Sequence, residues 1–350
     1  MICAKGRFGP AWTAGVRDPL LWKPRPLRRR GVRDDKASRV EHQEASFEDV
    51  TRMRFRWRGP SLVIDTPAKL NLHLEVLGKR GDGFHELETV MVSVGLYDTL
   101  ELTPASAGIR LSCLYGGQRG PIHLPAADKE NLVVRAASLL QELCGVSPGV
   151  QIQLTKRIPM EAGMGGGSSD AAAALMGLNH LWRLGLDGAA MHRAAAGLGS
   201  DVNFFLDSPV VAVCRGRGER IEPRELRGAL WFVVVKPPVG LSTADVFRAY
   251  RLMETNQKTP SDILAALQSG SAGRCGEALF NALQSQAEER SPPVVKALRE
   301  LRSQRVAGTA MTGSGTACFA VCRDRRHAEC VASVLRQRDV GAVYVVRTAA

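Results

Sequence analysis

The stretch Ile158-Pro-Met-Glu-Ala-Gly-Met-Gly-Gly-Gly-Ser-Ser-Asp-Ala-Ala-Ala-Ala174 decides how the rest of this sequence is understood. Four of the five residues from 163 to 167 are glycine, so the backbone can turn several N–H groups toward one anion. Ser168 and Ser169 can cap a helix that continues through the alanines, and the positive end of its dipole adds to the attraction. By itself the stretch predicts an anion site at the start of a helix.

Two common phosphate-binding motifs do not match this loop. A P-loop ends in Gly-Lys-Ser/Thr, and this loop contains no lysine. A dinucleotide fingerprint requires an acid at a strand end about 20 residues further on, whereas Asp187 stands between two predicted helices. A flexible linker is disfavoured because the loop joins a predicted strand, Val150–Lys156, to a predicted helix, Ser168–Leu184.

The surrounding segments predict an α+β fold, because strands and helices mix without strict βαβ alternation. The pattern of predicted helices and strands changes after Pro237 and Pro238. We therefore expect two domains, an ATP-binding domain of residues 61–230 and a C-terminal domain of residues 231–350. Apolar alternation predicts further strands at Ser61–Pro67, Leu70–Leu77, His85–Val94, Asp98–Leu102, Val210–Cys214, Leu230–Val235, Ala317–Cys322 and Ala342–Val346. Helical spacing predicts helices at Asn131–Leu143, Gly188–Ala196, Ile263–Leu267, Gly276–Glu289, Val294–Ser303 and Ala328–Gln337.

The composition favours an enzyme of small molecules over a nucleic-acid or membrane protein. The formal charge is +12, but the first 60 residues hold 15 of the 47 basic and 7 of the 35 acidic residues, so most of the excess lies there. The nearly balanced remainder and the 5% aromatic content argue against nucleic-acid binding. No apolar run reaches the roughly 18–20 residues of a membrane helix. Eight cysteines without a CxxC pair predict free thiols and a cytoplasmic protein.

Residues 1–60 are expected to form a basic leader outside the catalytic body. The stretch Lys23–Arg39 is rich in Arg and Pro and has little apolar periodicity, which predicts disorder. It lacks the apolar core of a secretory signal, and the acidic residues of Glu41–Asp49 disfavour an organellar transit peptide. The alternative is a natural start at Met53, directly before the first strand.

Three further motifs are ambiguous when each is taken alone. Lys69, in Thr66–Leu72, is either a solvated residue at a strand start or a fixed cation that steers a phosphate. Asp201, in Gly197–Phe205, is either a turn or cap residue or a carboxylate that accepts the proton of an attacking hydroxyl. Met311–Ala317 is either a tight turn or a nest of backbone donors.

Taken together and in this order, the motifs resemble those of the kinase superfamily that contains galactokinase, homoserine kinase, mevalonate kinase and phosphomevalonate kinase (GHMP). The resemblance covers about residues 61–346 and is strongest to the family of 4-diphosphocytidyl-2-C-methyl-D-erythritol kinases. It implies two domains, the first like ribosomal S5 domain 2 and the second ferredoxin-like. The segments that carry it are Pro67-Ala-Lys-Leu-Asn-Leu72, Gly78-Lys-Arg-Gly-Asp-Gly-Phe-His85, Gly163-Met-Gly-Gly-Gly-Ser-Ser-Asp170 and Gly199-Ser-Asp-Val202.

The resemblance implies ATP- and Mg²⁺-dependent phosphorylation of the erythritol 2-hydroxyl of a cytidine diphosphate sugar alcohol, in non-mevalonate isoprenoid synthesis. It implies that Asp201 is the general base, that Lys69 is the cation beside it, and that Phe84 and Phe247 sandwich the cytosine ring. Ser168, or else Ser169, is the candidate Mg²⁺ ligand. The implied ATP loop comprises Pro159, Met160, Glu161, Ala162, Gly163, Met164, Gly165, Gly166, Gly167, Ser168 and Ser169. The other implied substrate contacts are Asn71, His85, Gly313, Ser314 and Gly315.

Two residues depart from the family pattern. Phe84 stands where tyrosine is common, so its ring can stack but has no hydroxyl. Glu161 stands in the loop where glycine is usual, and its carboxylate would repel phosphates unless it points away or toward Mg²⁺. The alternative functions are another GHMP kinase, of homoserine or mevalonate type, and a non-catalytic ATP and ligand sensor. The small-molecule substrate is the only partner expected, and both a monomer and a homodimer stay open.

Overall fold

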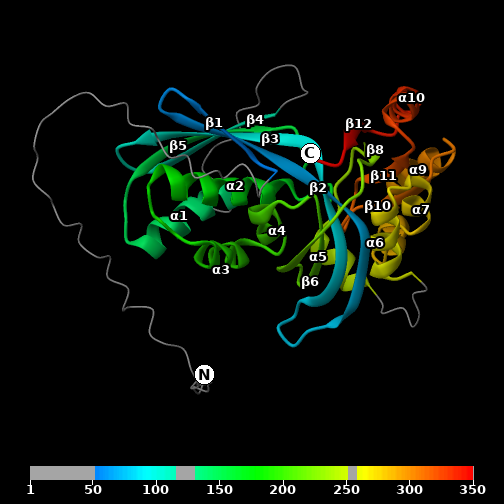
Figure 1. Cartoon of the computed structure of the whole chain (residues 1–350), viewed down its shortest axis with the longest axis horizontal. Helices are drawn as coiled ribbons and strands as arrows, with labels where there is room; N and C mark the ends of the chain where they lie inside the picture. Colours follow the sequence, from blue (N-terminus) through cyan, green and yellow to red (C-terminus); the bar gives the residue numbers. More distant parts are fainter. Residues whose placement is uncertain (1–51, 116–130, 251–257, 350) are drawn as a thin grey trace, which may run out of the picture. The chain divides into compact units, whose positions relative to one another are not determined.

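Two β-sheets organise the part of the chain that this computed structural model describes, residues 52–115, 131–250 and 258–349 (Figure 1). The larger sheet has the order β1-β2-β3-β5-β4, with β6 attached to β3, β7 attached to β6 and β9 attached to β2. Its strands are β1 (Arg54–Arg58), β2 (Ser61–Lys79), β3 (His85–Ala105), β4 (Ile109–Tyr115), β5 (Gly149–Lys156), β6 (Val211–Gly216), β7 (Arg220–Arg224) and β9 (Phe280–Asn281). The smaller sheet has the order β10-β11-β8-β12, from β8 (Trp231–Lys236), β10 (Gly308–Met311), β11 (Cys318–Cys322) and β12 (Ala342–Arg347).

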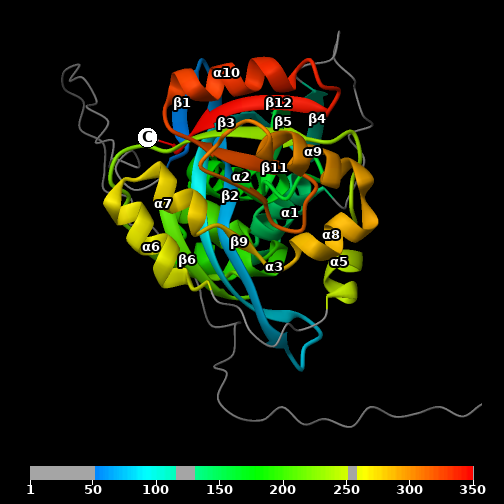
Figure 2. The ribbon, with the colours of Figure 1, turned by 90° about the vertical axis from the view of Figure 1, so that its right-hand side faces the viewer.

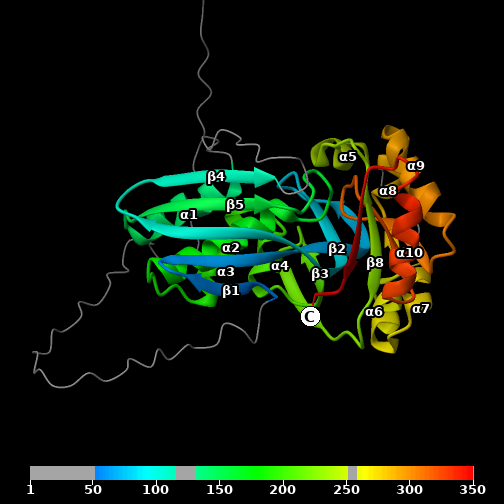
Figure 3. The same ribbon diagram turned by 90° about the horizontal axis from the view of Figure 1, so that it is seen from above.

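Helices cover one face of the larger sheet and both faces of the smaller one. Figure 3 shows α1 to α4 beneath the larger sheet, where α2 contacts both β2 and β3. In the smaller sheet, α7 and α9 contact β11, and Figure 2 shows α10 lying along β12. The helices are α1 (Leu132–Cys144), α2 (Gly166–Leu181), α3 (Gly188–Leu198), α4 (Val202–Asp207), α5 (Thr243–Ala249), α6 (Pro260–Ser269), α7 (Ala272–Glu277), α8 (Gln284–Arg290), α9 (Pro292–Arg302) and α10 (Arg325–Leu335).

The hairpin of β2 and β3 is longer than the sequence predicted. Each of these strands was expected as two shorter ones, but β2 continues over 19 residues and β3 over 21. The expected breaks are bulges: Pro67 pairs with Tyr97 while Ala68 pairs with Val94. A bulge accommodates a proline, which cannot donate to the ladder, and re-aims the side chains that follow. Lys69 lies directly after this bulge.

The single helix predicted over Gly276–Glu289 is wrong. α7 ends at Glu277, β9 pairs with β2 in parallel, and α8 begins only at Gln284. The helical spacing of apolar residues was real, but the pairing of Phe280 with His73 and of Asn281 with Leu74 outweighs it. Because this pairing joins residues about 200 positions apart, a local pattern cannot predict it.

Several short elements were also not predicted, among them β4, β7, β10, α4 and α5. Residues 54–58, which fall inside the expected leader, form β1 and pair with β2. Met53 is buried against the core of the larger sheet. The segments Lys23–Arg39 and Glu41–Asp49 lie outside the described residues.

One apolar core joins the two sheets and thereby fixes the position of the site. Leu70 and Leu72 of β2 are fully buried in it together with Phe232 of β8 and Phe319 of β11. The two phenylalanine rings meet edge to face, with centroids 5.8 Å apart. Successive residues of a strand point to opposite faces, so the flanking Lys69 is directed away from this core. Among the described residues, none of the helices has the length and apolar character that a membrane span requires.

The contact between α7 and β10 gives a stability prediction. A β-carbon on Gly276 would lie 2.2 Å from the carbonyl oxygen of Ala307, which is backbone and cannot rotate away. We expect Gly276→Ala to lower the free energy of unfolding by about 1–3 kcal/mol, measured by urea denaturation. In the same helix a β-carbon on Gly273 meets nothing nearer than 3.7 Å. Gly273→Ala should therefore be neutral or stabilising, and equal losses for both variants would contradict the explanation.

Candidate active site

Glycine is required by both conformation and space in the loop before α2. Gly163 and Gly165 have φ angles of 70° and 72°, in the left-handed region that favours glycine. A β-carbon on Gly163 would lie 2.1 Å from the carbonyl oxygen of Thr312, and one on Gly165 would lie 2.7 Å from the ring of Phe205. Helix α2 begins at Gly166, two residues earlier than predicted, so its first turn belongs to the loop itself.

This loop forms one wall of a pocket of about 380 Å³. The predicted residues that line it are Pro159, Met160, Glu161, Ala162, Gly163, Met164, Gly165, Gly166, Gly167 and Ser168. The lining residues that the sequence did not suggest are Cys113, Tyr115, Asn131, Leu132, Leu154, Lys156 and Asp170. They come from β4, β5 and the starts of α1 and α2, and elements so far apart leave no local signal of a shared pocket.

Ser168 and Ser169 have different surroundings. Ser169 is fully buried, and its hydroxyl donates to the carbonyl oxygen of Pro67 at 2.6 Å and lies 2.5 Å from the hydroxyl of Thr66. Ser169 therefore ties α2 to β2 and does not line the pocket. Ser168 lines the pocket, and a β-carbon on Gly199 would lie 3.8 Å from its hydroxyl oxygen.

A buried ion network lies under the loop. Lys156 donates to Asp98 at 2.5 Å and to Asp170 at 2.6 Å, and the second oxygen of Asp98 accepts from the backbone N–H of Ile158 at 2.8 Å. Burial lowers the pKa of Lys156, but the two carboxylates outweigh it and hold that pKa above its ordinary value. Burial raises the pKa of Asp170, and the neighbouring Asp98 adds to this effect. The network fixes β3, β5 and α2 where the loop begins.

Lys69 and Asp201 form an ion pair beside the glycine-rich loop. Lys69 is buried, with 3% of the residue exposed. Its ammonium lies 3.5 Å from a carboxylate oxygen of Asp201 and donates to Asn71 Oδ1 at 2.5 Å. Asp201 stands at the N-cap position of α4, yet its side chain makes no capping hydrogen bond. About a third of that side chain is exposed, so the carboxylate can reach a bound molecule while Lys69 holds it in place.

The turn between β10 and β11 closes over this pair. The hydroxyl of Thr312 accepts from the backbone N–H of Asn71 at 3.0 Å and lies 3.3 Å from the carbonyl oxygen of Gly163. A β-carbon on Gly313 would lie 3.4 Å from the ammonium of Lys69. Asn281 of β9 donates to the carbonyl oxygens of Met311 and Gly313, at 2.7 and 2.8 Å, and this fixes the turn. Four segments that are distant in sequence therefore meet here.

The carboxylate of Glu161 contacts the loop between β8 and α5. A β-carbon on Gly240 would lie 1.7 Å from Glu161 Oε2, so the side chain lies directly against that glycine. The negative charge of Glu161 also acts on Lys236. Burial lowers the pKa of Lys236, and the carboxylate of Glu161 opposes part of this shift. Residues of the C-terminal half of the chain therefore accommodate the carboxylate of Glu161.

The aromatic residues expected at the cytidine side have partners of their own. The rings of His85 and Phe247 are 5.2 Å apart between centroids and inclined by 31°. Phe84 is half exposed, and the guanidinium of Arg217 lies 4.8 Å above its ring centre. Burial lowers the pKa of His85, and the charge of Lys79 contributes.

Arg217 is the functional candidate that the sequence did not suggest. Its neighbour Gly218 lies against Asp201, because a β-carbon there would be 3.6 Å from Asp201 Oδ1. Arg217 thus stands between Asp201 and Phe84, in the turn from β6 to β7. The only local signal is a basic residue flanked by two glycines, which is too common to be specific.

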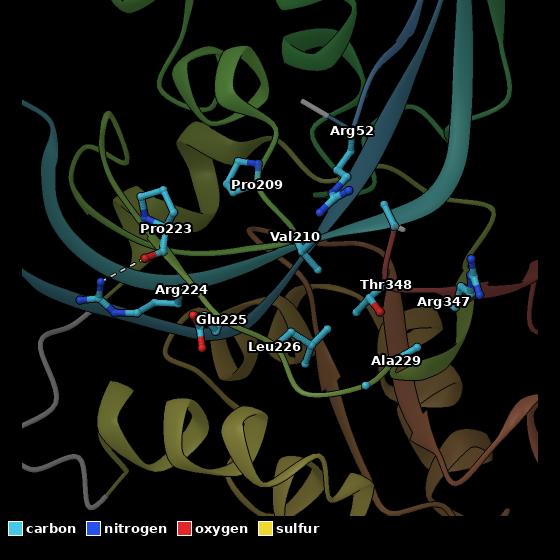
Figure 4. Close-up of a pocket in the computed structure, with 12 residues that line it drawn as sticks. Arg52, Pro209, Val210, Pro223, Arg224, Glu225, Leu226, Ala229, Arg347 and Thr348 are labelled. Carbon is cyan, nitrogen blue, oxygen red and sulfur yellow. Dashed lines mark hydrogen bonds between the residues drawn. The ribbon is translucent and has the colours of Figure 1, made fainter. Parts of the chain in front are cut away.

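A second pocket, of about 520 Å³, lies beside β6, β7 and the end of the described chain (Figure 4). It is lined by Arg52, Arg224 and Arg347 among others, but Figure 4 shows Arg224 and Arg347 on opposite sides, not directed at a common point. None of the predicted site residues lines it. Among the described residues, no group of three or more His, Cys, Asp or Glu side chains could hold a metal ion by itself.

Comparison with known proteins identifies the relatives of this chain. Residues 131–209 match the family model "GHMP kinases N terminal domain" and residues 263–340 match "GHMP kinases C terminal". A 4-diphosphocytidyl-2-C-methyl-D-erythritol kinase from Pelotomaculum thermopropionicum is 42% identical over 273 residues, which are 78% of this chain and 93% of that protein. The enzyme of the same name from Gloeobacter violaceus is 39% identical, over 80% of this chain and 92% of that protein.

Solved structures agree with these relatives. The crystal structure of a 4-(cytidine 5'-diphospho)-2C-methyl-D-erythritol kinase superposes with a TM-score of 0.69 at 35% identity and covers 82% of this chain and 99% of its own. An L. major mevalonate kinase, at 18% identity and a TM-score of 0.62, covers 81% of this chain and 94% of its own and shares the fold. The predicted α+β fold of the GHMP kinases is confirmed.

The buried ion network gives the second prediction. Lys156→Met leaves the carboxylates of Asp98 and Asp170 buried without their cation, so we expect a loss of about 3–5 kcal/mol in the free energy of unfolding. Chemical denaturation near neutral pH measures it. The additional change Asp170→Asn should restore part of the loss by removing one uncompensated charge. The exposed Lys79→Met is the control and should stay within about 0.5 kcal/mol; a loss of that size at Lys156 too would contradict a structural role for the network.

Proposed function

We propose that the glycine-loop pocket holds ATP and that Asp201 and Lys69 act on the acceptor hydroxyl. The reason is that this chain belongs to the 4-diphosphocytidyl-2-C-methyl-D-erythritol kinase family of the GHMP kinases. The chain is a kinase that phosphorylates 4-diphosphocytidyl-2-C-methyl-D-erythritol in the non-mevalonate route to isoprenoids. The roles proposed for Asp201 and Lys69 rest on their ion pair beside the glycine-rich loop, in which Lys69 Nζ lies 3.5 Å from a carboxylate oxygen of Asp201.

Asp201 is proposed as the general base for the erythritol 2-hydroxyl. The hydroxyl oxygen forms a bond to the γ-phosphorus of ATP, the bond from that phosphorus to the β–γ bridging oxygen breaks, and ADP leaves. The hydroxyl proton passes to the carboxylate of Asp201, which is partly exposed and engaged in no capping bond. The ammonium of Lys69 lies beside the reacting oxygens and stabilises the charge that develops on them. Asn71 holds that ammonium in position.

The phosphates of ATP are proposed to lie against Gly163–Gly167 and the start of α2. Backbone N–H groups that no helical carbonyl uses are available there, and the helix dipole favours anions. The adenine would then extend toward Tyr115, Asn131 and Leu132, which line the same pocket. Lys156 uses two of its three N–H donors on carboxylates, which leaves one for the nucleotide.

Ser168 is proposed as the residue of this chain that would hold Mg²⁺. Mg²⁺ prefers oxygen ligands and commonly keeps waters while it binds substrate phosphates. Ser168 offers such an oxygen in the pocket, whereas the hydroxyl of Ser169 is taken by Pro67 and Thr66. The ion supplies neutralisation of phosphate charge during transfer.

The cytidine diphosphate end of the substrate is proposed to lie between Asp201 and the aromatic residues. Phe84, His85 and Phe247 offer aromatic faces on which the cytosine ring can stack. The imidazole of His85 also offers a ring nitrogen that can form a hydrogen bond with the cytosine. With the 2-hydroxyl at Asp201 and the cytosine near Phe84, the diphosphate between them passes Arg217, whose guanidinium can pair with phosphate oxygens. Gly313, Ser314 and Gly315 would close the site near the erythritol.

A cytoplasmic location is also proposed. The described cysteines are free, and burial raises the pKa of Cys214, Cys275, Cys318 and Cys322, so these thiols resist ionisation. Free thiols in this number are typical of a reducing compartment.

The role of Asp201 is tested by Asp201→Asn. The amide keeps the shape but cannot take up the proton, so kcat should fall by about 10²–10⁴-fold while ADP affinity changes little. ADP release in a coupled assay and ADP binding by calorimetry measure the two quantities. Asp207→Asn, at the end of the same helix, is the control. Near-normal turnover of Asp201→Asn would show that another group is the base.

The role of Arg217 is tested by Arg217→Met. Loss of a charge-assisted contact to a diphosphate should raise the KM for the cytidine substrate by about 10–100-fold, with a smaller change in the KM for ATP. Arg220→Met is the matched control, because Arg220 lies in the same hairpin but pairs with Glu86. Equal effects on both substrates would contradict a specific contact with the cytidine substrate.

A further inference from the structure

Glu161 is held in a conformation that glycine would adopt more easily. Its φ angle is 50°, in the left-handed region where a β-carbon crowds the backbone. Strain of this kind persists where surrounding contacts hold the residue in place, and it is frequent at functional sites. The contacts of Glu161 therefore indicate what the residue does.

The side chain of Glu161 meets the loop that joins β8 to α5. Its carboxylate lies against Gly240 and acts electrostatically on Lys236. Lys236 donates to the carbonyl oxygens of Pro237 and Val239, at 2.8 and 2.7 Å, and so folds this loop around its own ammonium. Two of its three N–H donors are used in these bonds, and the ammonium is attracted by the carboxylate of Glu161.

Thr316 joins the same two loops from the other side. Its backbone N–H donates to the carbonyl oxygen of Glu161 at 3.2 Å, and its hydroxyl donates to that of Val239 at 2.8 Å. Farther along, the hydroxyls of Thr243 and Ser314 lie 2.8 Å apart. The ATP loop, the β8–α5 loop and the β10–β11 turn are thus hydrogen-bonded into one unit.

This unit connects the two ends of the active site. The β8–α5 loop leads directly into α5, which carries Phe247, and the ring of Phe247 packs on His85. A displacement of the β8–α5 loop therefore moves an aromatic residue of the cytidine side. Glu161 belongs to the lining of the pocket proposed for ATP.

We propose that Glu161 couples the two substrate sites, so that occupation of the ATP pocket strengthens binding of the cytidine substrate. The inference rests on the proposed function. Anionic phosphates in the pocket repel the carboxylate of Glu161 and press it toward Gly240 and Lys236. This fixes the β8–α5 loop and with it Phe247. Glu161 is a positioning residue in this scheme and takes no part in phosphoryl transfer.

The test is the dissociation constant of 4-diphosphocytidyl-2-C-methyl-D-erythritol, measured by calorimetry with and without saturating ADP and Mg²⁺. ADP cannot transfer a phosphoryl group, so both ligands stay intact. The wild-type constant should fall by about fivefold or more when ADP is present, and linkage requires the same factor for ADP when the substrate is present. In Glu161→Gln, which keeps the length and removes the charge, the factor should fall toward one.

Further variants separate coupling from general damage. Lys236→Met should lower the factor like Glu161→Gln, and the double variant should lower it no further than either single one. Glu161→Gly should also lose the coupling while its Tm does not fall, because glycine relieves the strained φ angle. Glu277→Gln, an exposed carboxylate on α7, is the control and should retain the wild-type factor.

The outcomes distinguish the inference from the proposed function. If the wild type binds both ligands but shows no coupling, or if Glu161→Gln keeps the full factor, the inference is overturned and the proposed function stands. If the wild type fails to bind ADP or the cytidine substrate, the proposed function fails first.

Discussion

The site depends on a close approach of three backbones that only glycine permits. The backbone N–H of Lys69 in β2 donates to the carbonyl oxygen of Met164 at 3.0 Å, and Gly163 lies against Thr312 of the β10–β11 turn. A β-carbon at Gly163 would lie 2.1 Å from the carbonyl oxygen of Thr312 and one at Gly165 would lie 2.7 Å from the ring of Phe205, so a side chain at either position would push the loop away from its neighbours. The glycine-rich loop therefore connects the two sheets and also forms one wall of the pocket.

The sequence predicted the parts of this site whose chemistry is local. A run of glycines before an alanine-rich helix, and a lysine and an aspartate in short motifs, can be recognised without a fold, and the structure brings Lys69 and Asp201 to 3.5 Å of each other. The sequence failed where distant pairing decides the structure. The expected helix over Gly276–Glu289 is interrupted by β9 because β2 offers a free edge there, and Asn281 in β9 then holds the turn over Lys69.

The buried charges show the same limit of prediction from the sequence. Lys156 reads in the sequence as the polar end of an alternating strand, yet it is buried between Asp98 and Asp170, both of which come from other elements. A buried ion pair adds little net stability by itself, but an unmatched member costs much, so such a network specifies one arrangement of its elements. Its position under the loop means that the geometry of the pocket and the integrity of the fold are determined by the same contacts.

Glu161 is a second charged residue whose partners lie far away in the sequence. Judged from the loop alone, the negative charge of Glu161 is unfavourable, because the glycines and the helix start there favour the binding of another anion. The residues that accommodate it, Gly240 and Lys236, lie about 80 positions away in the chain and belong to the loop that leads into α5. A substitution that is unfavourable for its own segment can persist when a neighbouring segment supplies the compensating contact. That contact joins the two segments, and it is the structural basis of the proposed coupling between the two substrate sites.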